Sequence, residues 1–201
     1  MNSQPYHKYI FDSKKRKFIG KFEEMYKNED IFGYDSWFQE KMNHLDKQIS
    51  LLIINNNKYE FNPILDVGCG KGTFTSFLKR GRNKVVGIDI SKTAIMKTKQ
   101  KHPDIEFLQL TVDEVVKTKR KWDLIVMMEI LSYIKNWKDI LRKTRKKTKK
   151  IYISLFLPQN PIGYVRSRNE LINEVKDNYI IEHEILLNNE NILILARSKR
   201  K

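Results

Sequence analysis

The residues best suited to chemistry surround three alternating glycines, Gly68, Gly70 and Gly72. A short apolar run over residues 63–67 precedes them, with Asp66 near its end, and a helical pattern follows. This order predicts a buried strand, a tight turn and a helix N-terminus. Because glycine lacks a Cβ, a ligand can approach the backbone there, and free N–H groups at a helix start favour polar ligands. The stretch therefore predicts a binding site for a polar ligand.

The elements that must position this turn alternate between apolar strands and helices. Further strands are expected over residues 84–90, 105–110, 123–128 and 150–157, with helices over 73–80, 91–101, 112–117, 133–147 and 167–175. Such alternation predicts a doubly wound, mostly parallel α/β sheet, and continuous apolar strands indicate helices on both faces. Residues 179–187 and 192–196 flank an asparagine-rich turn and predict a C-terminal antiparallel hairpin. Ser91 is the expected N-cap of the second helix.

The first 60 residues carry a different pattern and predict a helical cap. We expect partial order over residues 1–20, a helix over 18–26, a loop over 28–36 and a helix over 37–54 that residues 55–58 close. The whole chain, residues 1–201, is interpreted as one domain, with residues 1–60 as the cap and 61–201 as the α/β core.

Composition limits the classes of protein that fit. No apolar run approaches the roughly 20 residues that cross a bilayer, and the N-terminus lacks the apolar segment of a signal peptide. We therefore expect a cytoplasmic protein without a membrane span. Cys69 is the single cysteine of the sequence, which excludes an intramolecular disulfide. The sequence shows no cluster of metal-ligand residues, so we expect no metal site.

The formal net charge of +15 is gathered in clusters at residues 14–17, 117–121, 142–150 and 197–201. Basic clusters attract nucleic acid, anionic membranes or phosphorylated substrates. They also fit a lysine-rich composition in which lysine is the common surface residue, and no RNA-binding signature accompanies them. We favour the compositional explanation, which leaves nucleic acid as a less favoured partner. The sequence does not define the oligomeric state.

The spacing of the glycines separates three kinds of ligand. A P-loop requires G-x-x-x-x-G-K-[ST], but Lys71 is followed by Gly72. The dinucleotide fingerprint G-x-G-x-x-G fits the alternating glycines poorly. The pattern Asp-x-Gly-x-Gly-x-Gly closely resembles the first motif of the class I S-adenosylmethionine-dependent methyltransferases.

The resemblance extends over residues 62–157. Residues 87–91 are similar to the second-strand motif of that family, in which an acidic residue, here Asp89, binds both ribose hydroxyls. Residues 122–131 are similar to its fourth-strand motif, and the C-terminal hairpin resembles its reversed seventh strand. The resemblance implies a Rossmann-like seven-stranded sheet and S-adenosyl-L-methionine as the cofactor. Many relatives have Gly-Asp where this chain has Leu110-Thr111, so we expect backbone groups and apolar packing near Ile90 to bind adenine.

The resemblance also implies site residues. The expected cofactor-binding residues are Asp66, Gly68, Cys69, Gly70, Gly72, Asp89, Ile90, Glu129 and Trp37. The candidate catalytic residues are Glu129 and Tyr133, because reacting groups gather at the carboxyl ends of parallel strands. Glu129 would orient a substrate amine or accept its proton; alternatively it only lies near the sulfonium or opens the next helix. Packing is the alternative role for Tyr133 and Trp37.

A narrower resemblance concerns the N-terminal region of nodulation-type N-methyltransferases, which act on amino sugars of chitooligosaccharides. It rests on residues 22–26, 30–34 and 37–41, although Asp30-Ile31-Phe32 replaces the expected Asp-Pro-Trp. We therefore expect methyl transfer to a nitrogen or oxygen of a small molecule, amino sugar or glycan. An RNA or protein methyltransferase that uses the basic surface, or a cofactor-binding module without turnover, stays as the alternative.

Overall fold

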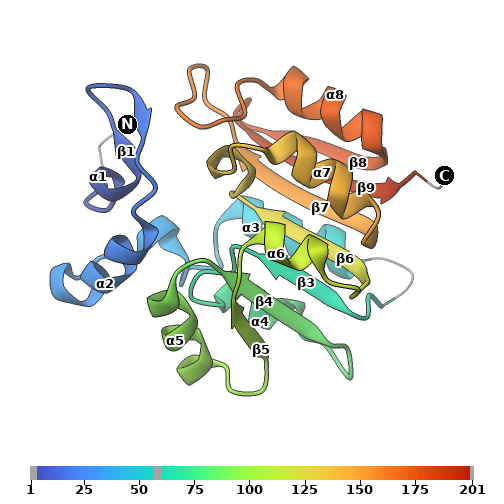
Figure 1. Cartoon of the computed structure of the whole chain (residues 1–201), viewed down its shortest axis with the longest axis horizontal. Helices are drawn as coiled ribbons and strands as arrows, with labels where there is room; N and C mark the ends of the chain where they lie inside the picture. The colour runs from blue at the N-terminus through green and yellow to red at the C-terminus, as the bar shows by residue number, and fades with distance from the viewer. Residues whose placement is uncertain (1–3, 57–59, 200–201) are drawn as a thin grey trace.

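The computed structural model describes residues 4–56 and 60–199, which contain one seven-stranded sheet (Figure 1). Its strand order is β5-β4-β3-β6-β7-β9-β8, and neighbours are parallel except along β9, which is antiparallel to β7 and β8. The strands are β3 Ile64–Val67, β4 Val85–Asp89, β5 Glu106–Gln109, β6 Trp122–Met128, β7 Thr148–Phe156, β8 Tyr179–Leu187 and β9 Asn191–Ser198. The predicted doubly wound sheet with a C-terminal hairpin is confirmed.

Helices cover both faces of this sheet. One cluster of buried side chains lies under α6 (Val112–Lys117), α7 (Trp137–Arg145) and α8 (Arg168–Asn178). A second cluster lies under α3 (Leu45–Asn55), α4 (Thr73–Leu78) and α5 (Lys92–Lys101). Along β6, Leu124 and Val126 belong to the second cluster while Ile125 and Met127 belong to the first. The strand is apolar from Leu124 to Met128 because side chains on both of its faces are buried.

Local capping sets several helix starts. Ser91 Oγ accepts a hydrogen bond from the Ala94 N–H at the start of α5, as predicted. Thr111 and Glu114 form a capping box that begins α6. The predicted helix over residues 133–147 is instead divided into the 3-10 helix η2 (Leu131–Tyr133) and α7.

The N-terminal region differs from its prediction. Residues 4–41, called the cap below, contain α1 (His7–Ile10), an antiparallel pair of β1 (Phe11–Asp12) and β2 (Lys17–Phe18), α2 (Phe22–Phe32) and the 3-10 helix η1 (Ser36–Phe38). The predicted helix over 18–26 is correct only over residues 22–26, and the predicted loop over 28–36 is wrong over residues 28–32, which belong to α2. Short strands of two residues leave no periodic signal, and α2 ends only at Gly33, whose backbone is left-handed.

The predicted helix over residues 37–54 is also wrong at its start. Trp37 and Phe38 have φ values of 58° and 49°, which interrupt a right-handed helix, and α3 begins at Leu45. Hydrogen bonds to residues distant in sequence hold this bend, so helical periodicity could not reveal it. The expected end of the helix at residues 57–58 lies outside the described residues.

The cap lies against α5 and against loops at the carboxyl ends of the central strands (Figure 1). Met25 and Tyr26 of α2 pack with Ala94 of α5, and Trp37 packs with Tyr133 of η2. The cap is therefore positioned over the edge where the sequence places the site. Among the residues described, we find no helix with the length and apolarity needed to cross a membrane.

Candidate active site

The turn after β3 is built from glycines with left-handed backbone. Gly68, Gly70 and Gly72 have φ values of 73°, 52° and 75°, which residues with a Cβ rarely adopt. A Cβ at Gly68 would overlap the Ile130 side chain, and one at Gly70 would overlap Gln39. The glycines are therefore required by packing of the protein on itself, in addition to any approach of a ligand.

Asp89 ends β4 beside this turn. Its carboxylate accepts hydrogen bonds from the Gly70 N–H at 3.0 Å and from the Ser91 N–H at 2.8 Å. Burial raises the pKa of Asp89 to about 6, although these N–H donors oppose the shift. A carboxylate has about four acceptor positions on its two oxygens, so the group can also accept from a hydroxyl of a vicinal diol. The adjacent Ile90 side chain is 51% exposed and free to cover a planar ring.

Asp66 lies beneath the turn rather than on its surface. Its side chain is buried, and Oδ2 accepts a hydrogen bond from Thr75 Oγ1 of α4 at 2.6 Å. Burial raises the pKa of Asp66 to about 7, and the charge of Asp89 adds to the shift. Cys69 is buried as well, and burial raises the pKa of its thiol. In this conformation both residues support the turn from within.

Glu129 follows β6 and joins it to β7. Its carboxylate accepts hydrogen bonds from Ser154 Oγ at 2.8 Å and from the Phe156 N–H at 2.7 Å. The Glu129 backbone has a φ of 57°, and its N–H donates to the Ser154 carbonyl at 2.8 Å. Burial raises the pKa of Glu129 against the effect of both donors. The side chain is therefore fixed in position and more easily protonated than an exposed glutamate.

Aromatic rings of the cap surround Tyr133. Phe18 stacks on its ring with 5.5 Å between centroids, while Phe22, Trp37 and Phe11 lie at 5.3, 6.0 and 6.1 Å. We call these five residues the aromatic cluster. Burial raises the pKa of the Tyr133 hydroxyl, and the charge of Glu129 adds to this. The cluster forms an apolar wall next to Glu129.

The loop after β7 meets the cap above this wall. Arg16 Nη2 donates to the carbonyl and to the side-chain oxygen of Asn160 at 2.9 and 2.8 Å. The Tyr164 ring lies 5.8 Å from that of Phe18. The strand ends, the cap and this loop therefore bring the predicted site residues together at one edge of the sheet. The sequence indicated neither Gln39, which is bonded to the turn, nor Tyr26, which is bonded to Gln39, because both contacts depend on the unpredicted bend.

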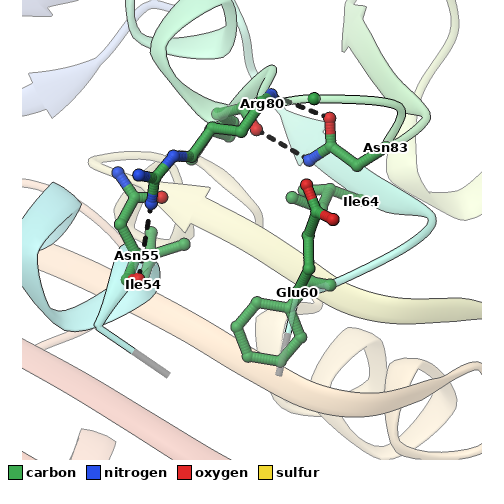
Figure 2. A pocket seen from close by; sticks show the side chains of 9 residues that line it. Ile54, Asn55, Glu60, Ile64, Arg80 and Asn83 are labelled. Carbon is green, nitrogen blue, oxygen red and sulfur yellow. Dashed lines mark hydrogen bonds between the residues drawn. The ribbon is translucent and has the colours of Figure 1, made fainter. Parts of the chain in front are cut away.

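The hollow shown in Figure 2 lies at the other end of the sheet. Its volume is about 370 Å³, and its lining consists of Ile54, Asn55, Glu60, Phe61, Ile64, Leu78, Arg80, Gly81 and Asn83. Arg80 donates from its side chain to the Asn55 carbonyl and from its N–H to Asn83 Oδ1. Because Ile64 begins β3, this hollow faces away from the carboxyl ends at which open α/β sheets bind ligands.

Known proteins resemble this chain in sequence and in fold. A family model described as a methyltransferase domain matches residues 65–150. The ubiquinone biosynthesis O-methyltransferase of Glaesserella parasuis serovar 5 (strain SH0165) is 28% identical over 138 residues, which are 63% of this chain and 57% of that protein. The corresponding enzyme of Nitrosococcus oceani is 34% identical over 76 residues, 35% of this chain and 32% of that protein. The chain thus spans about half the length of these relatives, or less.

Solved structures share the fold at low identity. The N-methyltransferase NodS from Bradyrhizobium japonicum WM9, in complex with S-adenosyl-L-homocysteine, has a TM-score of 0.71 at 16% identity, over 89% of this chain and 98% of that one. Magnesium protoporphyrin IX methyltransferase (ChlM) from Synechocystis PCC 6803 with bound SAM has a TM-score of 0.63 at 16% identity, over 86% and 94%. At these identities the likeness establishes the fold.

Proposed function

We propose that this chain is a class I methyltransferase domain that uses S-adenosylmethionine, and that it methylates a nitrogen or oxygen of a small molecule, amino sugar or glycan. The main support is the meeting of the Asp89 carboxylate, the glycine turn and the Glu129 carboxylate at one covered edge of the sheet. Such an edge is where open α/β sheets place ligands.

The residues present fit the cofactor. Asp89 would hold the ribose hydroxyls, and Ile90 would cover the adenine. The backbone of Gly68 and Gly70 would lie along the rest of the cofactor. Asp66, Cys69 and Gly72 would support the turn from beneath, while Trp37 would cover it from the cap. When bound, S-adenosylmethionine supplies an activated methyl group on a positively charged sulfur.

Glu129 and Tyr133 would act on the acceptor. Glu129 keeps acceptor positions beside the two bonds from β7, so it would orient an acceptor N–H or O–H group. Its raised pKa favours transient acceptance of a proton from that group. Tyr133 and the rings around it would exclude water from the reacting atoms.

Two relatives illustrate the range of acceptors. One enzyme is named for ubiquinone biosynthesis and O-methylation, the other for N-methylation. For this chain we propose a small acceptor because the cap covers the site with packed rings, which leaves little room for a folded polymer. An RNA or protein acceptor, and a module that binds the cofactor without turnover, are the competing functions.

Transfer of tritiated methyl groups from S-adenosylmethionine tests the proposal. The acceptor panel contains amino sugars, chitooligosaccharides, phenols, small amines, unfolded protein and total RNA, and calorimetry measures binding of S-adenosylhomocysteine. We expect cofactor binding and label in a small acceptor, with both lost in Asp89→Ala. Label confined to RNA or protein would establish a competing function. Absence of cofactor binding by the unsubstituted protein would overturn every version of the proposal.

A further inference from the structure

One side chain of the cap reaches the backbone of the glycine turn. Gln39 Oε1 accepts a hydrogen bond from the Lys71 N–H at 2.8 Å, and Gln39 Nε2 donates to the Tyr26 hydroxyl at 2.7 Å. The same amide lies on the face of Gly70 that a Cβ would fill. Tyr26 belongs to α2 and is only 3% exposed. Gln39 therefore connects the turn to the interior of the cap.

The side chain of Lys71 makes a second connection to the cap. Its Nζ lies 2.7 Å from Asp35 Oδ1 and 3.4 Å from Glu29 Oε1, and the Lys71 side chain is only 9% exposed. Glu29 also pairs with Lys97 of α5 at 3.3 Å. Buried charges are tolerated when they are paired in this way. Residue 71 is thus joined to the cap through both its backbone and its side chain.

The bend that carries Gln39 is held at a backbone cost. Trp37 and Phe38 are both left-handed, which costs on the order of 1–2 kcal/mol for each residue. Such conformations persist where surrounding contacts fix them, and they are concentrated at functional sites. One fixing contact is the hydrogen bond from the Ser36 N–H to Glu29 Oε1 at 2.9 Å. The bend also brings Trp37 to Tyr133.

We propose that Gln39 is a positioning residue that holds the glycine turn and the cap as one unit before S-adenosylmethionine binds. The identity of that ligand rests on the proposed function. A turn and a covering Trp37 that are already in place lower the ordering cost of binding. Gln39 acts through Lys71 and Tyr26 and requires no contact with the cofactor.

The test compares Gln39→Leu with Gln39→Glu in the full chain. Leucine removes both hydrogen bonds at similar volume. Glutamate keeps an acceptor for the Lys71 N–H, and the Tyr26 hydroxyl can donate to it. By calorimetry, Gln39→Leu should bind S-adenosylhomocysteine about 5- to 10-fold more weakly, and Gln39→Glu should stay within about threefold of the unsubstituted protein. Once an acceptor is identified, the KM for the cofactor should rise while kcat at saturation changes little.

Gln100→Leu is the matched control. Gln100 is exposed on α5, where it lines a second hollow that lies between α5 and the cap. This substitution should leave the Kd unchanged. Tryptophan fluorescence measures any movement of the cap, because Trp37 lies in the cap whereas Trp122 and Trp137 are buried in the core, where their surroundings should not change. Should Gln39→Leu fail to fold, Tyr26→Phe removes one of the two bonds and should weaken binding about threefold.

This inference is overturned if Gln39→Leu folds and binds S-adenosylhomocysteine as tightly as the unsubstituted protein. Where Gln39→Leu does not fold, an unchanged Kd in Tyr26→Phe overturns it. Either result leaves the proposed function intact. Failure of the unsubstituted protein to bind the ligand overturns the function itself.

Discussion

At the scale of single residues, two buried carboxyl groups connect the site to pH. Asp89 borders the glycine turn and Asp66 lies beneath it, and burial raises their pKa values to about 6 and about 7. Protonation has different consequences at the two positions. Asp89 would accept hydrogen bonds from hydroxyl groups of the cofactor, whereas Asp66 is buried and accepts a hydrogen bond from Thr75. The first should therefore affect ligand affinity and the second the stability of the fold.

We expect the affinity for S-adenosylhomocysteine to fall as the pH is lowered through about 6. Ionised Asp89 accepts hydrogen bonds on both oxygens, whereas its protonated form loses acceptor capacity, and the raised pKa of about 6 places this change near neutral pH. Calorimetry from about pH 5 to about pH 8 measures the effect. Asp89→Asn should bind about tenfold more weakly at the upper end and show a flatter profile. The same slope in both proteins would contradict the assignment.

Asp66 predicts a pH dependence of stability in the protein without cofactor. Its folded pKa of about 7 lies above the ordinary value of 3.8, so the folded state binds the proton more tightly than the unfolded state. This contribution is fully present below about pH 4 and is lost as the pH rises through about 7. Urea unfolding should show the free energy of unfolding decline across this window by up to a few kcal/mol.

Asp66→Asn should remove most of that decline, with the remainder due to Asp89 and Glu129, whose pKa values burial also raises. The control is Asp123→Asn, because Asp123 pairs with Lys149 at 2.7 Å away from the turn. This control should keep the slope of the unsubstituted protein. If Asp66→Asn also keeps it, Asp66 does not hold a proton in the folded state at these pH values.

At the scale of elements, the carboxyl ends of β6 and β7 are joined by one side chain. Glu129 accepts from Ser154 Oγ and from the Phe156 N–H, and its left-handed backbone makes the chain turn away from β6. Loss of the Glu129 carboxylate would leave the partly buried Phe156 N–H without this acceptor, which costs about 1–3 kcal/mol for a fully buried group and less here. The position of the carboxylate therefore depends on β7.

Ser154→Ala tests this dependence without changing Glu129. It removes the hydrogen bond to Glu129 Oε1 while the Phe156 N–H bond remains. We expect a fall in kcat of about 3- to 10-fold with little change in cofactor Kd, because Ser154 fixes the group that faces the acceptor. Glu129→Gln should lower kcat further if the carboxylate accepts a proton. An unchanged kcat in Ser154→Ala would show that Glu129 needs no fixing from β7.

The strands and helices of the sheet could be predicted because each leaves a local signal. The apolar run of β6 and the Ser91 N-cap of α5 are examples. The bend at Trp37 leaves none, since it is held by Glu29 and by the turn. The same division applies to the site. Asp89 follows from a strand end and the glycine spacing, whereas Gln39 is found only when the cap is folded onto the turn.

At the scale of the whole molecule, most basic clusters lie away from the site. Lys121 Nζ donates to the Lys146 carbonyl and Lys147 Nζ to the Thr118 carbonyl, so two clusters meet just before β6 and β7 begin. In the sheet, Arg197 of β9 lies opposite Lys150 of β7, so the C-terminal cluster begins at that same end. Residues 200–201 lie outside the described part. A polyanion bound at that end would contact the amino ends of β6 and β7, whereas Glu129 follows the carboxyl end of β6. This distribution supports a small acceptor over RNA.

Residues 14–17 are the exception, since this cluster lies at the tip of the β1–β2 pair over the site. All four side chains are exposed, yet Arg16 is bonded to Asn160 and Phe18 is packed on Tyr133. Trypsin, which cuts after lysine and arginine, must bend the chain locally to cleave there. Bound cofactor should hold the cap through the turn and the aromatic cluster, and so reduce such opening.

Limited trypsin digestion should therefore cut early within residues 14–17, and saturating S-adenosylhomocysteine should slow this cut several-fold. Residues 117–121, which are equally exposed but lie before β6, give an internal control whose cleavage should not respond to the ligand. Mass spectrometry of the fragments identifies each site. Because cleavage of a transiently opened segment follows its open population, the change in rate measures how strongly the ligand closes the cap. Equal protection of both segments would indicate general stabilisation, and the cap would then close independently of the cofactor site.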